Sequence, residues 1–334
     1  EFGLGVSLFG NTLAIGATEA DPEGVSGAGA LYLYRIEANG SVSFLSKVTA
    51  QDKAAEDKFG HSVSQSGDIL AVGAWSANQG SLSNAGAAYL FRLESNGTAS
   101  FLTKITAPDK ATEDHFGFSV SQSGNILAVG ARNADVSGIS DAGAAYIFRL
   151  ESNGTASFLT KITASDRAAS DHFGFSVSQS GDVLAIGAYG ATSGGVHNAG
   201  VVYLYRLEAN GTVSFLTKVT APDKGPSDYF GFSVSPFANV LSVGAFHSDP
   251  GALQSAGAAY TFDMSEILNR RPTNLNPTAP LSFAENQPIG IVVGEFNATD
   301  PDTNATLTYH LVSGAGDGNN SLFTLETNGT LQTA

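Results

Sequence analysis

Four positions in this 334-residue chain carry side chains of the types that make binding contacts. Each follows a Gly-Ala pair and opens a ten-residue segment of variable content and fixed length; these residues are Trp75, Arg132, Tyr189 and Phe246. Such types are enriched at binding hot spots, and aromatic faces can stack on sugar rings. We therefore predict a ligand-binding rim. The alternative is that these side chains pack between neighbouring repeats, each adding about 1.5–3 kcal/mol of burial.

Catalytic patterns are not apparent in the sequence. It contains no Gly-x-Ser-x-Gly, His-Glu-x-x-His or Gly-x-x-x-x-Gly-Lys motif. His115 and His172 share one repeat position, but Lys58 and Tyr229 occupy it in other repeats. A catalytic base would not normally be exchanged for lysine, so we expect no enzymatic activity.

Pairs of aspartates five residues apart could hold a cation. They are Asp52/Asp57, Asp109/Asp114, Asp166/Asp171 and Asp223/Asp228. Aspartate also commonly accepts backbone hydrogen bonds in turns and caps, and this second interpretation is favoured.

A repeat of 57 residues positions all of these groups. Phe-Gly recurs at residues 2, 59, 116, 173 and 230, followed in the same phase by Gly-Ala and then Ala-Gly. Each full copy contains four strand-like runs separated by turn residues and shows no helical period. We expect four-stranded antiparallel sheets. The turn at Asn96-Gly97 predicts a two-residue hairpin with Phe91 opposite Leu102.

Apolar residues on both faces of each sheet favour face-to-face packing of successive sheets. A β-propeller buries both faces and leaves only short edges, whereas solenoid repeats usually run shorter than this one. Five copies are present, and the fifth lacks its last run. We therefore expect an all-β fold that is part of a larger propeller, and treat a closed five-bladed ring as the alternative.

The order Phe-Gly, Gly-Ala and Ala-Gly-Ala-Ala-Tyr-Leu-Phe resembles FG-GAP repeats, the units of the integrin α-subunit head, over residues 1–264. That resemblance implies a propeller concerned with extracellular adhesion. The family's proline after Gly-Ala is replaced here, and its Asp-x-Asp-x-Asp-Gly calcium loop is missing. Calcium in the blades is therefore not implied.

A second domain is predicted after a linker at residues 265–280, which is rich in proline and asparagine. Residues 281–334 contain Ala-Glu-Asn, Ala-Thr-Asp-Pro-Asp, Leu-Thr-Tyr and Asn-Gly-Thr-Leu in the order of a cadherin-like domain. About half of such a β-sandwich is present, so we predict a truncated, cadherin-like sandwich.

The cadherin resemblance implies calcium sites at its carboxylates, since Ca²⁺ takes six to eight oxygen ligands. Glu285, Asp300 and Asp302 match the family's acidic motifs, although Arg270 and Arg271 stand where animal cadherins have an acidic linker. The alternative is an Asp-Pro-Asp turn whose carboxylates accept backbone N–H groups.

Composition narrows the functional class further. The net charge of −15 opposes binding to nucleic acid, and no apolar run is long enough for membrane insertion. The absence of cysteine excludes disulfides and thiol chemistry. We expect a non-catalytic adhesion or recognition module, extracellular or at the cell surface, whose partner is a protein or polysaccharide. The alternative is the substrate-docking region of a larger secreted hydrolase or lyase.

Overall fold

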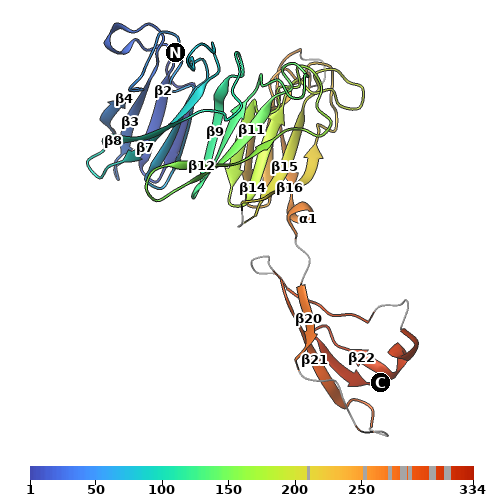
Figure 1. The fold of residues 1–334 in the computed structure, drawn as a ribbon. Helices are drawn as coiled ribbons and strands as arrows, with labels where there is room; N and C mark the ends of the chain where they lie inside the picture. Colours follow the sequence, from blue (N-terminus) through green and yellow to red (C-terminus); the bar gives the residue numbers. More distant parts are fainter. Residues whose placement is uncertain are drawn as a thin grey trace. The chain divides into compact units, whose positions relative to one another are not determined.

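The computed structural model describes residues 1–208, 211–250, 254–269, 273–278, 284, 288–300, 306–311 and 317–334. The chain divides into two compact units, Glu1–Met264 and Ser265–Ala334, and each is taken by itself below (Figure 1).

The first unit consists of five antiparallel sheets, here called blades 1 to 5, which follow one another in chain order (Figure 1). Blade 1 contains β1 (Val6–Phe9), β2 (Thr12–Ala17), β3 (Ala30–Ile36) and β4 (Val42–Val48), with a short 3-10 turn, η1 (Pro22–Gly24). Blade 2 contains β5 (Ser62–Ser66), β6 (Ile69–Ala74), β7 (Ala87–Leu93) and β8 (Ala99–Ile105). Blade 3 contains β9 (Phe116–Ser123), β10 (Ile126–Ala131), β11 (Ala144–Leu150) and β12 (Ala156–Ile162).

Blade 4 contains β13 (Ser176–Ser180), β14 (Val183–Ala188), β15 (Val201–Leu207) and β16 (Val213–Val219). Blade 5 has three strands, β17 (Phe230–Phe237), β18 (Val240–Ala245) and β19 (Ala258–Asp263). The prediction of an all-β fold built from four-stranded propeller blades is thereby confirmed.

The hairpin register differs from the prediction by one residue. In blade 2, Phe91 lies opposite Phe101, and a bulge between Leu90 and Phe91 restores the pairing further along. The turn is longer than a two-residue hairpin, because the Gly97 N–H donates to the Glu94 carbonyl and Gly97 adopts a φ of 86°. A type I turn followed by a left-handed glycine is the usual three-residue hairpin loop.

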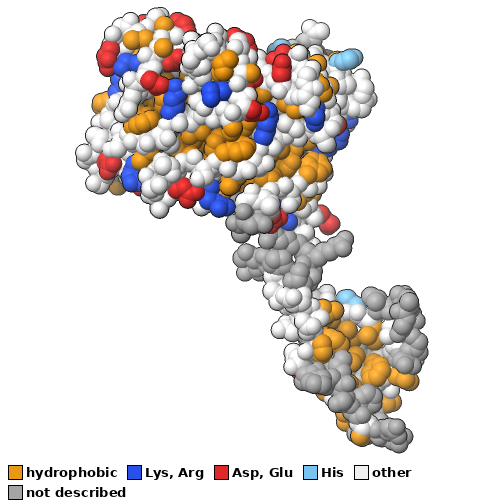
Figure 2. Space-filling view, viewed as in Figure 1, with side chains coloured by type: hydrophobic (Ala, Val, Ile, Leu, Met, Phe, Trp, Pro, Cys, Tyr) orange, Lys and Arg blue, Asp and Glu red, His pale blue; other side chains and the backbone are white. Residues whose placement is uncertain are grey.

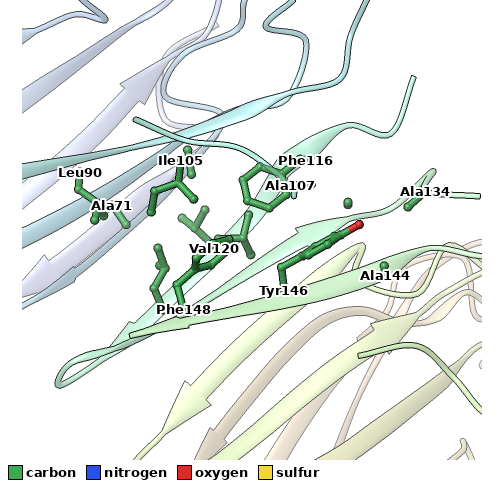
Figure 3. Close-up of a cluster of buried hydrophobic side chains, with 14 of the residues drawn as sticks. Ala71, Leu90, Ile105, Ala107, Phe116, Val120, Ala134, Ala144, Tyr146 and Phe148 are labelled. Atoms are coloured by element: carbon green, nitrogen blue, oxygen red, sulfur yellow. The ribbon is translucent and has the colours of Figure 1, made fainter. Parts of the chain in front are cut away.

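Most of the hydrophobic core lies between blades. At the interface of blades 2 and 3, Phe116, Tyr146 and Phe148 of blade 3 pack against Ala71 and Leu90 of blade 2 (Figure 3). The first strands of successive blades also contact one another in order, β1 with β5, then β9, β13 and β17. Face-to-face packing along a shared inner edge is the propeller arrangement that the two apolar faces predicted.

The five blades do not close into a ring. Phe2 of blade 1 is 59% exposed, while its equivalents in the other blades, such as Phe59, are fully buried. At the other end, Phe237 of blade 5 is 75% exposed. The alternative of a closed five-bladed ring is therefore wrong for this chain.

The second unit contains a four-stranded sheet in the order β20-β21-β23-β22. Its elements are α1 (Ser265–Leu268), β20 (Thr273–Pro277), β21 (Val292–Thr299), η2 (Asp317–Leu322), β22 (Phe323–Leu325) and β23 (Thr330–Thr333). Strand β20 lies in the stretch predicted as a linker, and its pairing with β21 makes it part of this sheet. The cadherin-like sandwich remains a prediction. Among the described residues, no helix has the length and apolar character needed to cross a membrane.

Candidate functional site

The four predicted rim residues are part of a longer row of side chains, here called the aromatic strip. Three repeat positions in blades 2 to 5 supply it: the residue before Phe-Gly, the residue after Phe-Gly, and the residue after Gly-Ala. Lys58, before Phe-Gly in blade 2, is not a member, because it pairs with Glu19 and Glu56 instead. Its members are His61, Trp75, His115, Phe118, Arg132, His172, Phe175, Tyr189, Tyr229, Phe232 and Phe246. Blade 1 has Leu4 and Thr18 at two of these positions, so the strip begins at blade 2.

The ring of the residue after Phe-Gly forms the spine of the strip. The Phe118 and Phe175 ring centroids are 4.9 Å apart, and those of Phe175 and Phe232 are 4.7 Å apart. His61 continues the row on the other side, with its ring 4.5 Å from Phe118. The similar spacing arises because each ring stands on, or directly before, the first strand of its blade, and these strands pack in succession.

Arg132 lies in the middle of the strip and is its one permanent cation. Its guanidinium carbon is 4.1 Å from the centroid of the Phe118 ring, 5.9 Å from that of Trp75 and 5.8 Å from that of Phe175. Arginine over an aromatic face is attracted by the ring's quadrupole, and the attraction grows when the site is partly desolvated. Three rings therefore hold a positive charge at a fixed place on a protein of net charge −15.

Tyr189 and Phe246 extend the strip across blades 4 and 5. The Tyr189 ring stacks on His172, with 5.1 Å between centroids and 7° between planes, and lies 4.4 Å from Phe175. The Phe246 ring is 4.2 Å from Phe232 and is 43% exposed. The structure thus brings all four predicted rim residues into one surface, on which they pack against neighbouring rings and keep part of their area exposed.

The imidazoles of the strip are held in the neutral form. Burial lowers the pKa of His61 to about 4, and its Nδ1 donates to the Phe118 carbonyl at 3.0 Å. Burial also lowers the pKa of His115, and the neighbouring Arg132 guanidinium lowers it further. Arg132 Nε donates to His115 Nδ1 at 3.4 Å, and His115 Nε2 faces Glu113 at 3.3 Å. These contacts fix the position of the Arg132 guanidinium. No member of the strip is a carboxylate, so no strip residue neutralises its charge.

The paired aspartates have structural partners in place of a cation. After the last strand of each of blades 1 to 3, the first aspartate of the pair joins a tyrosine and a lysine of the following blade, and this set is here called the Asp–Tyr–Lys triad. In one triad, Asp109 accepts from the Tyr146 hydroxyl at 2.8 Å and from Lys161 Nζ at 2.7 Å. The second aspartate caps a turn, as Asp114 does by accepting from the Ala111 N–H at 2.6 Å. The interpretation of these pairs as turn and cap residues is favoured over a cation site.

The sequence carries a signal for the triads, but it becomes readable only with the fold. Each tyrosine follows its aspartate by 37 positions and each lysine follows by 52. Residues this far apart in the sequence are seen to be neighbours only when the stacking of the blades is known. They connect consecutive blades, since Asp109 lies beyond the last strand of blade 2 and its partners lie on β11 and β12.

Of the three predicted calcium ligands, one lies among the described residues. Glu285 and Asp302 lie outside the described residues. Asp300 is half-buried just after β21. In the described part of the chain, no three acidic or histidine side chains gather as a metal site would require. Calcium at these residues therefore stays a prediction.

A hollow separate from the strip lies between the hairpins of blades 3 and 4, with a volume of about 360 Å³. Among the residues that line it are Asn125, Arg149, Asp182 and Glu208. Charges of both signs share this hollow and no aromatic ring lines it, so it lacks the features that single out the strip.

Four-stranded antiparallel blades that pack face to face in succession define a propeller-type repeat protein. The FG-GAP repeat family matches residues 42–91, 100–148, 157–205 and 213–262, which together make up more than half of the chain. The chain belongs to this family. Each match begins on the outer strand of one blade and ends on the third strand of the next.

No curated protein matches the chain. Among solved structures, Sqt1 from Chaetomium thermophilum is similar over 80% of this chain and 71% of that chain, with 14% sequence identity and a TM-score of 0.44. A similarity of this degree carries no functional argument.

Proposed function

We propose that this chain is a non-catalytic recognition module of an extracellular or cell-surface protein, and that it binds a protein or polysaccharide along the aromatic strip. The family assignment supports a recognition module. Adhesion, location and the absence of catalysis belong to the proposal. The observation that carries it is the continuous strip across four blades, with Arg132 held among three rings.

The aromatic strip is rigid, which is one reason to propose it as the binding surface. The strip residues stand on, or directly beside, strands that are locked between blades, so little conformational entropy remains to be lost on binding. Phe118 and Phe175, for example, lie one residue beyond glycines that touch the preceding blade. Aromatic side chains with only two rotatable bonds suit such preorganised sites.

The chemistry of the strip indicates what it could recognise. Half-exposed ring faces favour apolar sugar faces or aromatic and aliphatic side chains, and Arg132 favours a carboxylate or sulfate at the centre. The histidines add hydrogen-bonding capacity without charge at neutral pH, because burial lowers the pKa of His61 and of His172. A ligand with a flat apolar face and one anionic group fits this pattern.

Point variants that preserve packing can test the site. Arg132→Gln and Tyr189→Leu retain side-chain volume while removing the cation and one ring face. Phe215→Ala is the matched control, because Phe215 is a 55% exposed aromatic on the outer strand β16, away from the strip. Figure 2 shows other apolar side chains on the surface around β12 and β16.

The assay measures binding of the full chain to soluble neutral polysaccharides, uronate-containing polysaccharides and cell surfaces. We expect at least a tenfold loss for both strip variants and no change for the control. Equal binding by all three proteins would exclude the strip, and turnover of any polysaccharide by the chain would contradict the non-catalytic proposal. Repeating the assay with EDTA tests the proposed calcium-binding role of Glu285, Asp300 and Asp302 in the second unit.

A further inference from the structure

The hollow between the hairpins of blades 3 and 4 contains one cation and one anion that do not pair with each other. Arg149 lines it from blade 3 and Glu208 lines it from blade 4. Among the described residues, neither side chain finds a partner for an ion pair or a hydrogen bond, although both border the same space of about 360 Å³. Two opposite charges that stay apart in one hollow offer a ligand one site for an anionic group and one for a cationic group.

The residue in the first hairpin turn of each blade decides whether the arginine of that blade is paired. Where the turn carries an aspartate, it pairs with this arginine, and these pairs are Asp68–Arg92 at 3.4 Å and Asp182–Arg206 at 3.5 Å. Blade 3 has Asn125 in the turn, and a neutral amide cannot neutralise the Arg149 guanidinium. Blade 1 follows the same rule: its turn carries Asn11, and Arg35 has no ion-pair partner in the described part of the chain.

The Arg149 guanidinium reaches the outer hairpin of blade 4. Its Nη2 lies beside Gly211, where a Cβ added to that glycine would stand 2.9 Å from it. At the equivalent Gly97 of blade 2, the nearest atoms belong to Leu45 instead, although blade 1 also carries an unpaired arginine. Glycine at position 211 thus leaves the space that the guanidinium occupies. An unpaired arginine that is also seated at the following hairpin distinguishes the blade 3–4 hollow from the interface of blades 1 and 2.

The other groups that line the hollow favour a ligand with N–H donors. Gln179 Nε2 donates to the Gly181 carbonyl at 3.0 Å, which orients the amide, and Gln179 Oε1 is buried without a partner among the described residues. A buried acceptor without a donor costs free energy, and a ligand N–H would restore the missing bond. The Glu208 carboxylate and Gln179 Oε1 together suit an ammonium group, which has three donors. Ile126 and Leu207 add an apolar stretch of wall.

We propose that this hollow binds a free α-amino acid, whose carboxylate pairs with Arg149 and whose ammonium pairs with Glu208 and donates to Gln179. An amino acid matches the hollow because it brings one charge of each sign, and arginine binds a carboxylate with two parallel hydrogen bonds. An aliphatic side chain on the ligand would contact Ile126 and Leu207. The hollow is separate from the aromatic strip, so this proposal does not depend on the function proposed for that surface.

The test titrates the full, ¹⁵N-labelled chain with L-alanine, L-serine and L-leucine near neutral pH and at low ionic strength, where charge pairing is least screened. Acetate and methylammonium carry one of the two charges each, and glycine betaine carries both but has no N–H group. We expect the best of the amino acids to bind with a dissociation constant of about 1 mM or tighter. Each of the three partial probes should bind at least tenfold more weakly than that amino acid.

Four variants test the residues of the hollow. Arg149→Gln and Glu208→Gln each remove one charge and should weaken binding at least tenfold. Asn125→Asp gives blade 3 the turn residue of blades 2 and 4, so it should pair with Arg149 and weaken binding by a similar factor without lowering Tm. Arg35→Gln is the matched control, because it removes an unpaired arginine from the same repeat position outside the hollow. This control should bind the amino acids as the original chain does.

The backbone amide signals of Gly181 and Gly211, which border the hollow, report where the ligand binds. The proposal is overturned if no amino acid shifts these signals at about 20 mM, well above the expected dissociation constant. Acetate that binds as tightly as the amino acids would also overturn it, because Arg149 would then be a simple anion site. So would an Asn125→Asp protein that binds like the original chain, or an Arg35→Gln protein that loses binding as Arg149→Gln does.

Discussion

The glycine of the Gly-Ala pair is predicted to be the least replaceable residue of each inner blade. Gly130, on β10, has an ordinary strand φ, so alanine would cause no backbone strain there. A Cβ added to Gly130 would nevertheless lie well under 3.0 Å from the Gly174 carbonyl oxygen and 3.0 Å from its carbonyl carbon. Gly174 belongs to the next blade, so relief requires that blade to move away.

The loss of stability expected for Gly130→Ala depends on how well blades 3 and 4 are packed at this interface. A shift of about 1 Å forfeits a quarter to a half of each dispersion contact across the gap, and here Phe173 and Ile186 are fully buried. Overpacking of a core usually costs about 1–3 kcal/mol. We expect Gly130→Ala to reach the upper end of that range, and to lower Tm by about 6–12 °C.

Gly244→Ala in blade 5 is the matched control. Its added Cβ would come close only to the Ser233 hydroxyl, which can rotate away, because no other blade among the described residues lies against this glycine. Alanine is otherwise the better strand residue by about 0.5–1 kcal/mol. Thermal unfolding of the full chain, followed by the fluorescence of Trp75, should show no loss for this variant. A Gly130→Ala protein as stable as the Gly244→Ala protein would refute the close-approach argument.

Two further predictions concern pH. Burial raises the pKa of Asp109, but hydrogen bonds from its lysine and tyrosine partners outweigh this and lower it below the ordinary value. The triad therefore stabilises the fold at neutral pH, and this contribution is lost as pH falls below about 4. We expect Asp109→Asn to cost up to about 1 kcal/mol at pH 7, since the pair is partly exposed and screened, and to cost less at pH 3. Asp223 bonds to Tyr260 of blade 5, which has no fourth strand to supply a lysine. Asp223→Asn should therefore cost less at pH 7, and equal losses measured by thermal unfolding would contradict the triad's role. Burial lowers the pKa of His61 to about 4, so stability should fall as pH drops from about 6.5 to 4. His61→Phe, which installs the residue found at this position in blades 3 to 5, should raise Tm at pH 4.5 more than at pH 7.5, and a shift independent of pH would exclude His61 as the titrating group.

Much of the fold could be predicted because its signals are local and repeated. Phe-Gly, Gly-Ala and Ala-Gly at fixed spacing predicted the blades, and apolar residues on both faces predicted their stacking. The hairpin register was predicted wrongly, because Gly97 ends a longer turn than the Asn-Gly pair suggests. A bulge that accommodates such a turn depends on the geometry of both strands.

The candidate site could be predicted only in part. Trp75, Arg132, Tyr189 and Phe246 were singled out by type and position, but Phe118 and Phe175 looked like ordinary strand residues. Likewise, the aspartate pairs suggested either cations or turns, and the partners Tyr146 and Lys161 were not connected with Asp109.

The sequence by itself therefore determined the repeat, the strands and the two-sided apolar pattern, since these depend on turn chemistry and on the alternation of side chains along a strand. The tertiary structure alone decided which side chains meet across blades and where the aromatic strip runs. Those contacts depend on the rigid-body stacking of sheets whose equivalent residues stand 57 positions apart. No local preference of the chain encodes a contact over that separation.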